Sequence, residues 1–376
     1  MKRIPVIDCT DLYHPHQDVG DNFDIVAPYA LPEIDLRAVI LDATNRFRQP
    51  HCPDGPPGPR EPGLIPLSQM NYIFDRQVPF AVSPFEPMQS PGDEMRSAPA
   101  FQQAGIELLL RTLREAEERV EIMIFCSCRT VAAAFNREPD LFRRKAGRIH
   151  ISAGTTSGEM FDVNWEEKKR LPLKPGSAGY REWDVELDVH AYVCLLRSGL
   201  SLALYPCASD RGPFSLHRHN TYYQLGKLSF IRQMEPSLRS YLAYAFTKHL
   251  RHDFLRAMES GPEPELLDQI DALQSHHVWE TALWLEVSGR KLVKRPGVGY
   301  RIVAADDVKP DDVVLKNDQT QCQIKVHDDG RFDFELTTKK TGVTIYDRGD
   351  GLEENQQAMG EALRDLYLGF RGALQA

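Results

Sequence analysis

The chain has 376 residues, a formal net charge of -9 and 42% hydrophobic residues. This length predicts one large α/β domain or one domain with an appendage. The acidic balance argues against a general nucleic-acid-binding protein, because no broad basic surface is available to displace phosphate counterions. No apolar run is long enough to cross a bilayer, and the N-terminus lacks the pattern of a signal peptide. The seven cysteines, which form no CxxC pair, indicate a reducing compartment. We therefore expect a cytoplasmic protein with no membrane partner.

An apolar run near the N-terminus leads directly into a group of acids. Residues 4–7 (Ile-Pro-Val-Ile) predict a buried strand, and residues 24–31 show helical spacing that Pro28 weakens. The acids therefore gather at the carboxyl end of a strand, where open α/β sheets bind ligands. They are Asp11, Asp18, Asp21 and Asp24.

So many like charges are unfavourable unless a cation, protons or solvent relieves them. Ca²⁺, which takes about six to eight oxygen ligands, would do so. The alternative is an acidic surface loop whose aspartates cap a helix and face water.

Strand and helix patterns then alternate along the chain. The helix over 106–113 has apolar residues at i, i+3, i+4 and i+7. Alternation of this kind is the βαβ rhythm of a mostly parallel sheet. The predicted strands are 36–41, 78–82, 120–125, 148–154 and 202–205. The other predicted helices are 130–135 and 188–198, and residues 235–258 and 263–290 are mainly helical.

The pattern changes after about residue 295, where short strands are separated by polar turns. The strands are expected at 313–315, 323–326, 331–336 and 343–346, before a last helix over 354–374. Asp328-Asp329-Gly330 is a hairpin signal. We therefore predict an α/β domain over residues 1–295, with a mostly parallel central sheet flanked by helices. A small β-rich C-terminal segment over 296–376 ends in a helix and packs on that domain.

Several short motifs occur in a familiar order. Asp8-Cys9-Thr10-Asp11 ends the first strand, and Pro32-Glu33 precedes the second. This order resembles the nucleoside hydrolase family, the inosine–uridine-preferring type, in which a DxDPGxDD segment follows the first strand. Counting back from Pro32 without gaps places Asp21 at the second aspartate of the pair and Gly20 at the first. The leading aspartate is then Asp11 or Asp18, because residues 12–17 look inserted.

The resemblance continues to about residue 290. Asn45 follows the second strand, where the family has an active-site asparagine. The segment 125–132 resembles the strand and turn from which the family offers a backbone carbonyl to calcium. Residues 140–154 resemble the family's segment of Arg/Lys-rich helix end, strand and glycine turn. Residues 182–191 (EWDVELDVHA) resemble the family's E-F-N-x-x-x-D-x-x-A, whose glutamate and asparagine hold the ribose. The resemblance therefore implies that Glu182 and Asp184 contact a ribosyl substrate.

The resemblance implies a calcium-dependent hydrolase of N-glycosidic bonds and a homo-oligomer, either a dimer or a tetramer. Such chemistry needs a carboxylate base beside a metal-held water. The implied base is Asp11 or Asp18, and the implied metal ligands are the four aspartates of the first segment. Asn45, Glu182, Asp184, His276 and Glu280 are the implied substrate-binding residues.

Three departures from the family argue against full activity. Gly20 replaces an aspartate, Asp184 replaces an asparagine, and the Ala282 register places Trp279 at a metal position. Glu280 could replace that ligand only if the local backbone differs, and His276 or His277 could supply the missing acid. Both histidines could instead be exposed residues near a helix start.

Two other functions stay open beside the hydrolase. One is a binding protein that keeps the pocket and has lost hydrolysis. The other is an unrelated metal-dependent α/β hydrolase. A carboxylate at the fourth metal position and an acid near the leaving base would favour the hydrolase.

Overall fold

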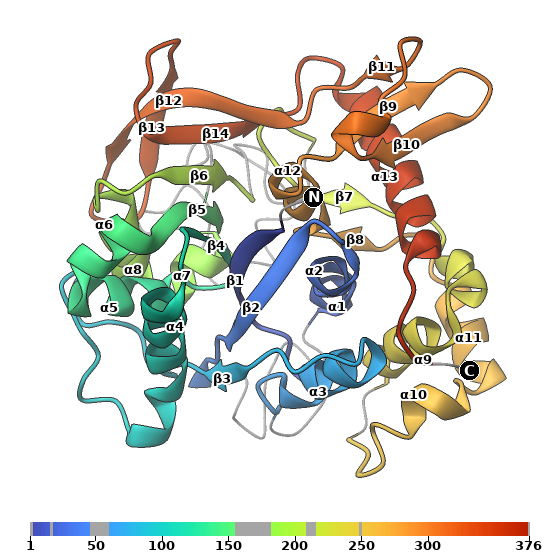
Figure 1. Cartoon of the computed structure of the whole chain (residues 1–376), viewed down its shortest axis with the longest axis horizontal. Coiled ribbons are helices and arrows are strands. Elements are labelled where there is room, and N and C mark those ends of the chain that lie inside the picture. Colours follow the sequence, from blue (N-terminus) through green and yellow to red (C-terminus); the bar gives the residue numbers. More distant parts are fainter. Residues whose placement is uncertain are drawn as a thin grey trace, which may run out of the picture.

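The structure is a computed structural model that describes residues 3–15, 18–45, 60–154, 182–207, 216–247 and 250–374. Within these ranges nine strands form one central sheet, in the order β13-β12-β14-β6-β5-β4-β1-β2-β3 (Figure 1). The strands are β1 (Ile4–Thr10), β2 (Ile34–Leu41), β3 (Phe80–Val82), β4 (Val120–Phe125), β5 (Ala146–Ser152), β6 (Leu202–Tyr205), β12 (Asp318–Val326), β13 (Phe332–Leu336) and β14 (Val343–Asp347).

The strands from β3 to β14 in this order are all parallel to their neighbours. Strand β12 is antiparallel to β14, and β13 is antiparallel to β12. The chain leaves β1 for β2 on one side and returns to β4 on the other side of β1. The strand order therefore reverses between β1 and β4, and ligands of open α/β sheets bind at the carboxyl ends of the strands at such a point.

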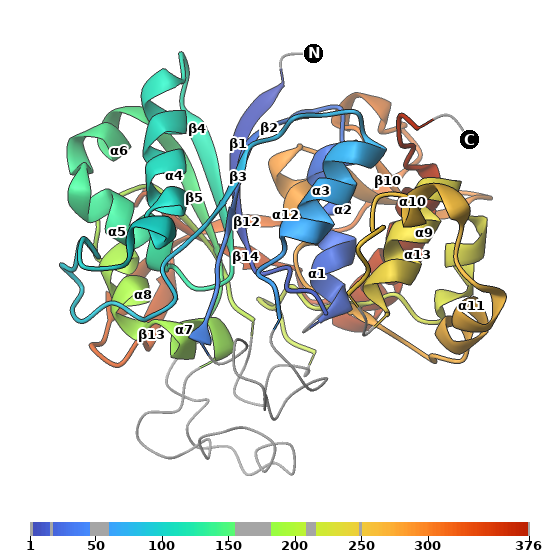
Figure 2. The same cartoon turned by 90° about the horizontal axis from the view of Figure 1, so that it is seen from below.

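Helices cover both faces of the sheet in two separate layers (Figure 2). One layer holds α4 (Ala104–Glu115), α5 (Arg129–Arg137), α6 (Pro139–Lys145) and α8 (Val189–Leu196). The other holds α1 (Val19–Asp24), α2 (Val26–Ala30), α3 (Leu64–Ile73), α9 (Pro236–Ala245), α12 (Thr281–Val287) and α13 (Leu352–Gly369). Shorter helices are α7 (Trp183–Leu187), α10 (Ala257–Ser260), α11 (Pro264–Asp271), and the 3₁₀ turns Ala100–Gln102, Leu228–Gln233 and Ala305–Asp307.

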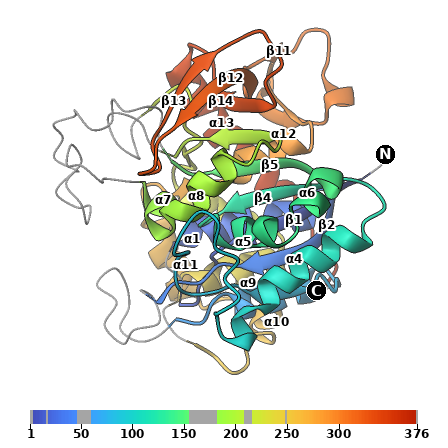
Figure 3. The same cartoon turned by 90° about the vertical axis from the view of Figure 1, so that its left-hand side faces the viewer.

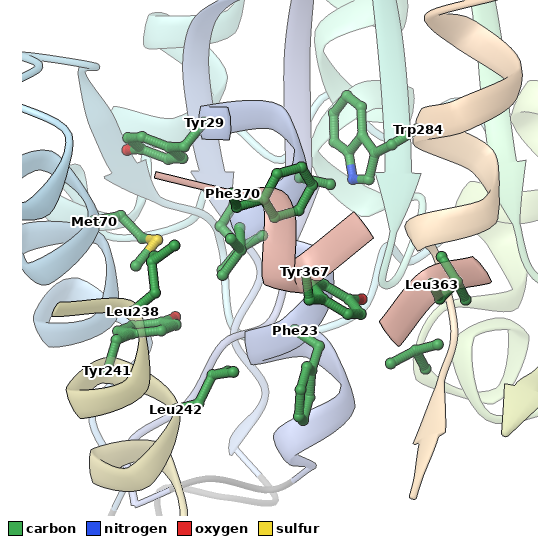
Figure 4. Packing of buried hydrophobic residues seen from close by; sticks show 14 of the residues in the cluster. Phe23, Tyr29, Met70, Leu238, Tyr241, Leu242, Trp284, Leu363, Tyr367 and Phe370 are labelled. Carbon is green, nitrogen blue, oxygen red and sulfur yellow. The ribbon is translucent and has the colours of Figure 1, made fainter. Parts of the chain in front are cut away.

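Each helical layer encloses its own hydrophobic cluster. In β1, Ile7 and Cys9 belong to the cluster under α4 and α5, whereas Val6 belongs to the cluster under α1, α9 and α13. Figure 4 shows part of that second cluster, with Phe23 and Tyr241 among its aromatic rings. Because side chains alternate along a strand, Asp8 of β1 points to the same face as Val6.

The predicted fold class is confirmed by this sheet and its helical layers. The C-terminal strands β12, β13 and β14 lie beyond β6 at one edge of the same sheet (Figure 3). The predicted hairpin joins β12 to β13, and Gly330 in its turn has a φ of 88°. A separate three-stranded sheet consists of β9 (Lys291–Arg295), β10 (Gly299–Val303) and β11 (Val313–Val314).

Two regions differ in detail from the sequence-based expectation. The helix expected over 24–31 is two short helices, α1 and α2, and Pro28 is tolerated because it lies in the first turn of α2. The mainly helical region 263–290 contains the short strand β8 (His277–Val278), which pairs with β7 (Tyr223–Gln224). Among the described residues, no helix is both long and apolar enough to cross a bilayer.

Candidate active site

The carboxyl ends of the central strands bring polar side chains from distant parts of the sequence to one edge of the sheet. Asp11 follows β1, Asp42 follows β2, Ser152 ends β5 and Cys207 follows β6. All four are buried. This edge includes the point between β1 and β4 where the strand order reverses.

Helix α1 adds further acids to this edge. Asp18 caps the helix, and its Oδ1 accepts a hydrogen bond of 2.7 Å from the backbone N–H of Gly20. Asp21 is buried, and burial together with the charges of Asp11 and Asp18 raises its pKa well above the ordinary value. The predicted metal-binding aspartates therefore lie close enough to interact.

Asp24 and Glu280 lie close to Asp21. Asp24 accepts hydrogen bonds from the backbone N–H groups of Thr281 (2.6 Å) and Trp279 (3.0 Å) at the start of α12. Asp21, Asp24 and Glu280 each offer an oxygen, and these oxygens lie within 4.8 Å of one another. Burial and the neighbouring Asp24 and Asp21 raise the pKa of Glu280 well above its ordinary value. Glu280, expected as a substrate-binding residue, is thus placed beside the aspartates.

Glu182 and Asp184 form a further group of acids beside Cys207, which follows β6. Glu182 precedes α7 and accepts a 2.9 Å hydrogen bond from the N–H of Gly154, whose φ of 83° favours glycine. Burial raises the pKa of Glu182 to about 7. Burial, together with the charges of Glu182 and Asp11, raises the pKa of Asp184. Glu182 and Asp184 form a second triad with Cys207. We call the following residues the acidic group: Asp11, Asp18, Asp21, Asp24, Glu182, Asp184 and Glu280.

Arg129, at the start of α5, brings a positive charge to this edge of the sheet. It forms ion pairs with Asp42 (3.4 Å) and Asp188 (3.1 Å), and all three side chains are buried. Its guanidinium also donates to the backbone carbonyls of Ala43, Pro84 and Leu187. Among the described residues, no Arg or Lys forms an ion pair with a member of the acidic group itself. Sequence analysis missed Arg129 and Asp42, although both follow predicted strands.

The residues present fit a hard divalent cation. The triad of Asp21, Asp24 and Glu280 offers only carboxylate oxygens, the ligands that Ca²⁺ prefers. Asp8 in β1 is also buried, and burial, with a smaller contribution from the charge of Asp24, raises its pKa well above the ordinary value. Its Oδ1 is buried and has no hydrogen-bond partner. Unpaired buried carboxylates are costly, and a cation would remove that cost.

Trp279 lies against Gly20, so two of the three departures from the family pattern are in contact with each other. A Cβ built on Gly20 would lie 2.8 Å from the Cδ1 atom of the indole and closer still to its nitrogen. The indole N–H donates a hydrogen bond to Asp18, which lowers the pKa of that carboxyl against the larger effect of burial. The absent side chain at position 20 therefore provides the space that the indole fills.

Aromatic rings surround Trp279. The ring of Tyr222 meets it edge to face at 4.3 Å, and the ring of His277 stacks on it at 5.3 Å with an interplanar angle of 6°. The Tyr222 side chain also hydrogen-bonds to Cys207. These rings therefore connect the two halves of the acidic group. Sequence analysis assigned no role to Tyr222, because its partners are far away in the chain.

Of the remaining predicted substrate-binding residues, His276 lies near Asp18, whereas the contact given for Asn45 is with Glu86 outside the acidic group. The ring of His276 lies 5.8 Å from that of Phe23 and 5.7 Å from that of Phe246, and its Nε2 is 3.9 Å from Asp18. Burial lowers the pKa of His276 to about 4. Asn45 follows β2, and its amide donates to the side chain of Glu86.

Comparison with known proteins identifies the fold. No family model matches the sequence, and no curated protein sequence matches it. The structure is similar to a purine-preferring ribonucleoside hydrolase from Gardnerella vaginalis, with 12% identity, a TM-score of 0.53 and coverage of 97% of this chain and 99% of that chain. A plant nucleoside hydrolase has 14% identity, a TM-score of 0.53 and coverage of 96% and 99%. An inosine-guanosine nucleoside hydrolase has 13% identity, a TM-score of 0.51 and coverage of 97% and 98%. The chain therefore has the nucleoside hydrolase fold, as its sequence motifs imply.

Proposed function

We propose that this protein is a calcium-dependent hydrolase of N-glycosidic bonds in nucleosides or related ribosyl compounds. The observation that carries the proposal is the acidic group, whose buried and half-buried carboxyl groups lie together at the carboxyl edge of the sheet, where the strand order reverses. Within the described part of the chain, no Arg or Lys forms an ion pair with any of them. The nucleoside hydrolase fold supports the same activity.

The proposed cation ligands are Asp11, Asp18, Asp21 and Asp24, and Glu280 is placed to complete the set. When bound, Ca²⁺ would polarise a water molecule and hold ribose hydroxyls. Because Ca²⁺ polarises water only modestly, a carboxylate must accept its proton, and Asp11 and Asp18 are both candidates.

Glu182 and Asp184, which lie beside Cys207, are proposed to hold the sugar. Glu182 and Asp184 would accept hydrogen bonds from ribose hydroxyls. Their negative charge would also stabilise the positive charge that develops at C1′ as the base departs. His276 and Asn45 are proposed to border the bound ligand. We further propose that the protein acts in the cytoplasm on a small molecule and forms a homo-oligomer.

Calorimetry on chelator-stripped protein tests the cation site. We expect about one Ca²⁺ per chain in the wild type, and we expect Asp21→Ala to abolish binding because it removes a ligand of a hard cation. Asp350→Ala is the matched control, since the Asp350 side chain is 92% exposed in the C-terminal segment. Unchanged affinity in the Asp21→Ala variant would remove this assignment.

A second function is favoured by the contact between Gly20 and Trp279. An indole in place of a metal-binding carboxylate would leave a protein that binds ribosyl compounds without cleaving them efficiently. We therefore expect hydrolysis of inosine, uridine, adenosine and cytidine to be weaker than in the family by about 10²–10⁴-fold, the range lost with one positioned acid or base. Release of reducing sugar in the presence of calcium measures this. Turnover on the order of 10 s⁻¹ on any of the four would contradict it.

A further inference from the structure

The acidic group has more carboxyl groups than one divalent cation can bind, and a positive charge beside the remaining acids would favour their ionised form. Five of its acids lie in two separate triads, Asp21 with Asp24 and Glu280, and Glu182 with Asp184 and the thiol of Cys207. With an ion in the first triad, no Arg or Lys among the described residues forms an ion pair with the second triad. The nearby Arg129 is already paired with Asp42 and Asp188. A ligand that brings its own positive charge would therefore be stabilised here.

The aromatic rings lie where such a charge would be bound. Trp279 hydrogen-bonds to Asp18 on one side, and Tyr222 hydrogen-bonds to Cys207 on the other. Both rings are partly exposed. A cation over the face of a Trp or Tyr ring is attracted by the ring quadrupole.

The surroundings of His276 bear on how the base can leave. A neutral base must be protonated as its bond to C1′ breaks, and the resemblance offers His276 as one donor. Its ring packs between those of Phe23 and Phe246, and its Nε2 faces Asp18. A base that is already cationic needs no such donor.

We propose that the substrates of this site are cationic N-ribosyl compounds, in which the nitrogen bonded to C1′ belongs to a positively charged heteroaromatic ring such as a pyridinium. This inference rests on the proposed function. The carboxyl groups of the two triads ionise beside the cation, and the partly exposed rings of Trp279 and Tyr222 supply aromatic contact with the cationic ring.

The reaction balances without an external acid. Water adds to C1′, and the C1′–N bond breaks with its electron pair passing to the ring nitrogen. The ring thereby becomes neutral, and the water proton passes to Asp11 or Asp18. The products are ribose, the neutral base and one proton.

A matched pair of probes isolates the positive charge. N-ribosylnicotinamide carries a pyridinium ring, and its 1,4-dihydro form is neutral and of similar size. We would measure binding of each to the calcium-loaded protein by calorimetry, and cleavage by release of ribose. We expect the cationic probe to bind at least about tenfold more tightly, which corresponds to about 1.4 kcal/mol. We also expect it to be cleaved faster than the neutral probe and faster than inosine.

The outcomes separate this inference from the proposed function. Equal binding and cleavage of both probes would overturn the preference for cations while supporting the hydrolase. If neither probe nor any common nucleoside is cleaved, the hydrolase is overturned, and the ratio of the two binding constants then decides the preference alone. A ratio near one would overturn it.

Two variants link the preference to the named residues. Asp184→Asn removes one negative charge from the second triad, and Trp279→Leu removes an aromatic face. Each should reduce the binding ratio of cationic to neutral probe by several-fold. Asp328→Asn is the control, because the Asp328 side chain is 93% exposed and forms an ion pair with Arg197, which is not a member of the acidic group. An unchanged ratio in both variants would show that the charge is recognised elsewhere.

Discussion

Two groups of buried acids in this protein have opposite surroundings. At the carboxyl edge of the sheet, the acidic group consists of carboxylates whose charged neighbours are mainly other carboxylates. At the end of β14, Asp347 is also buried, but basic side chains surround it. It accepts hydrogen bonds from Arg218 Nε (2.7 Å) and Lys316 Nζ (2.6 Å).

The pKa shifts of the two groups run in opposite directions. Burial alone would raise the pKa of Asp347, but hydrogen bonds from Arg218, Lys316 and the N–H of Gly349 outweigh it and hold the pKa below its ordinary value. Burial and like charges raise the pKa of Asp21. The comparison shows that Asp347 belongs to a self-contained structural ion pair. Within the described ranges the acidic group forms no ion pair with Arg or Lys, and it is the kind of cluster found at functional sites.

The largest expected effect comes from removing Arg129, the buried basic residue that forms ion pairs with Asp42 and Asp188 at the carboxyl edge of the sheet. Arg129→Met would leave Asp42 and Asp188 buried without their shared cation, and we expect a loss of about 3–5 kcal/mol in the free energy of unfolding. Urea denaturation measures this loss. Arg143→Met is the control, because its ion pair with Asp140 is exposed and should contribute less than about 1 kcal/mol. Similar losses in both variants would show that Arg129 is not the main structural counter-charge at this edge.

The second prediction concerns how the stability of the metal-free protein depends on pH. Burial raises the pKa of Glu182 from 4.5 to about 7 in the folded protein. The stability that follows from its protonation is complete below pH 4.5 and is lost as the pH rises through about 7. Metal-free protein should therefore lose about 3 kcal/mol from this residue over that range, and Asp11, Asp21 and Asp184 act in the same direction.

Thermal denaturation between pH 5 and 8, with and without calcium, measures this dependence. Glu182→Gln should flatten the decline, whereas Asp347→Asn should leave its slope unchanged, because the lowered pKa of Asp347 lies below this range. Calcium should restore stability most at the higher pH, where the carboxylates are charged. A calcium effect independent of pH would indicate that the ion does not bind the acidic group.

Much of the sheet could be predicted from the sequence. The strands Val120–Phe125 and Leu202–Tyr205 were predicted with the observed bounds, because short and largely apolar runs are typical of strands buried on both faces. The hairpin of β9 and β10 was not predicted. Lys291 and Arg295 give β9 a mixed, partly exposed pattern, so its pairing depends on neighbours that the local sequence does not specify.

From local sequence pattern alone, the site was predictable only where its residues are close together in the sequence, whereas Glu182, Asp184 and Glu280 were assigned to it through the family resemblance. Asp18, Asp21 and Asp24 lie within one helix and its cap, so their proximity follows from local structure. The positions of Tyr222 and Cys207 beside Glu182 depend on tertiary packing, and no local pattern marks them. Motif spacing alone could not show which atoms would fill the space that an absent side chain leaves.

The smallest predicted effect tests that space directly. Gly20→Ala would place a methyl group within 2.8 Å of the indole Cδ1 of Trp279 and closer to its nitrogen, so the ring must shift. We expect a loss of about 1–3 kcal/mol in the free energy of unfolding, as overpacking typically costs. Gly92→Ala is the control, because a Cβ there meets no atom within 4 Å, and it should change stability by less than about 0.5 kcal/mol. Trp279→Leu removes the bicyclic ring and should relieve the overlap, so the double variant should lose less than the sum of the single variants. Strict additivity in this double-mutant cycle would show that Gly20 and Trp279 are not coupled, and that the indole does not depend on the missing side chain for its place beside Asp18.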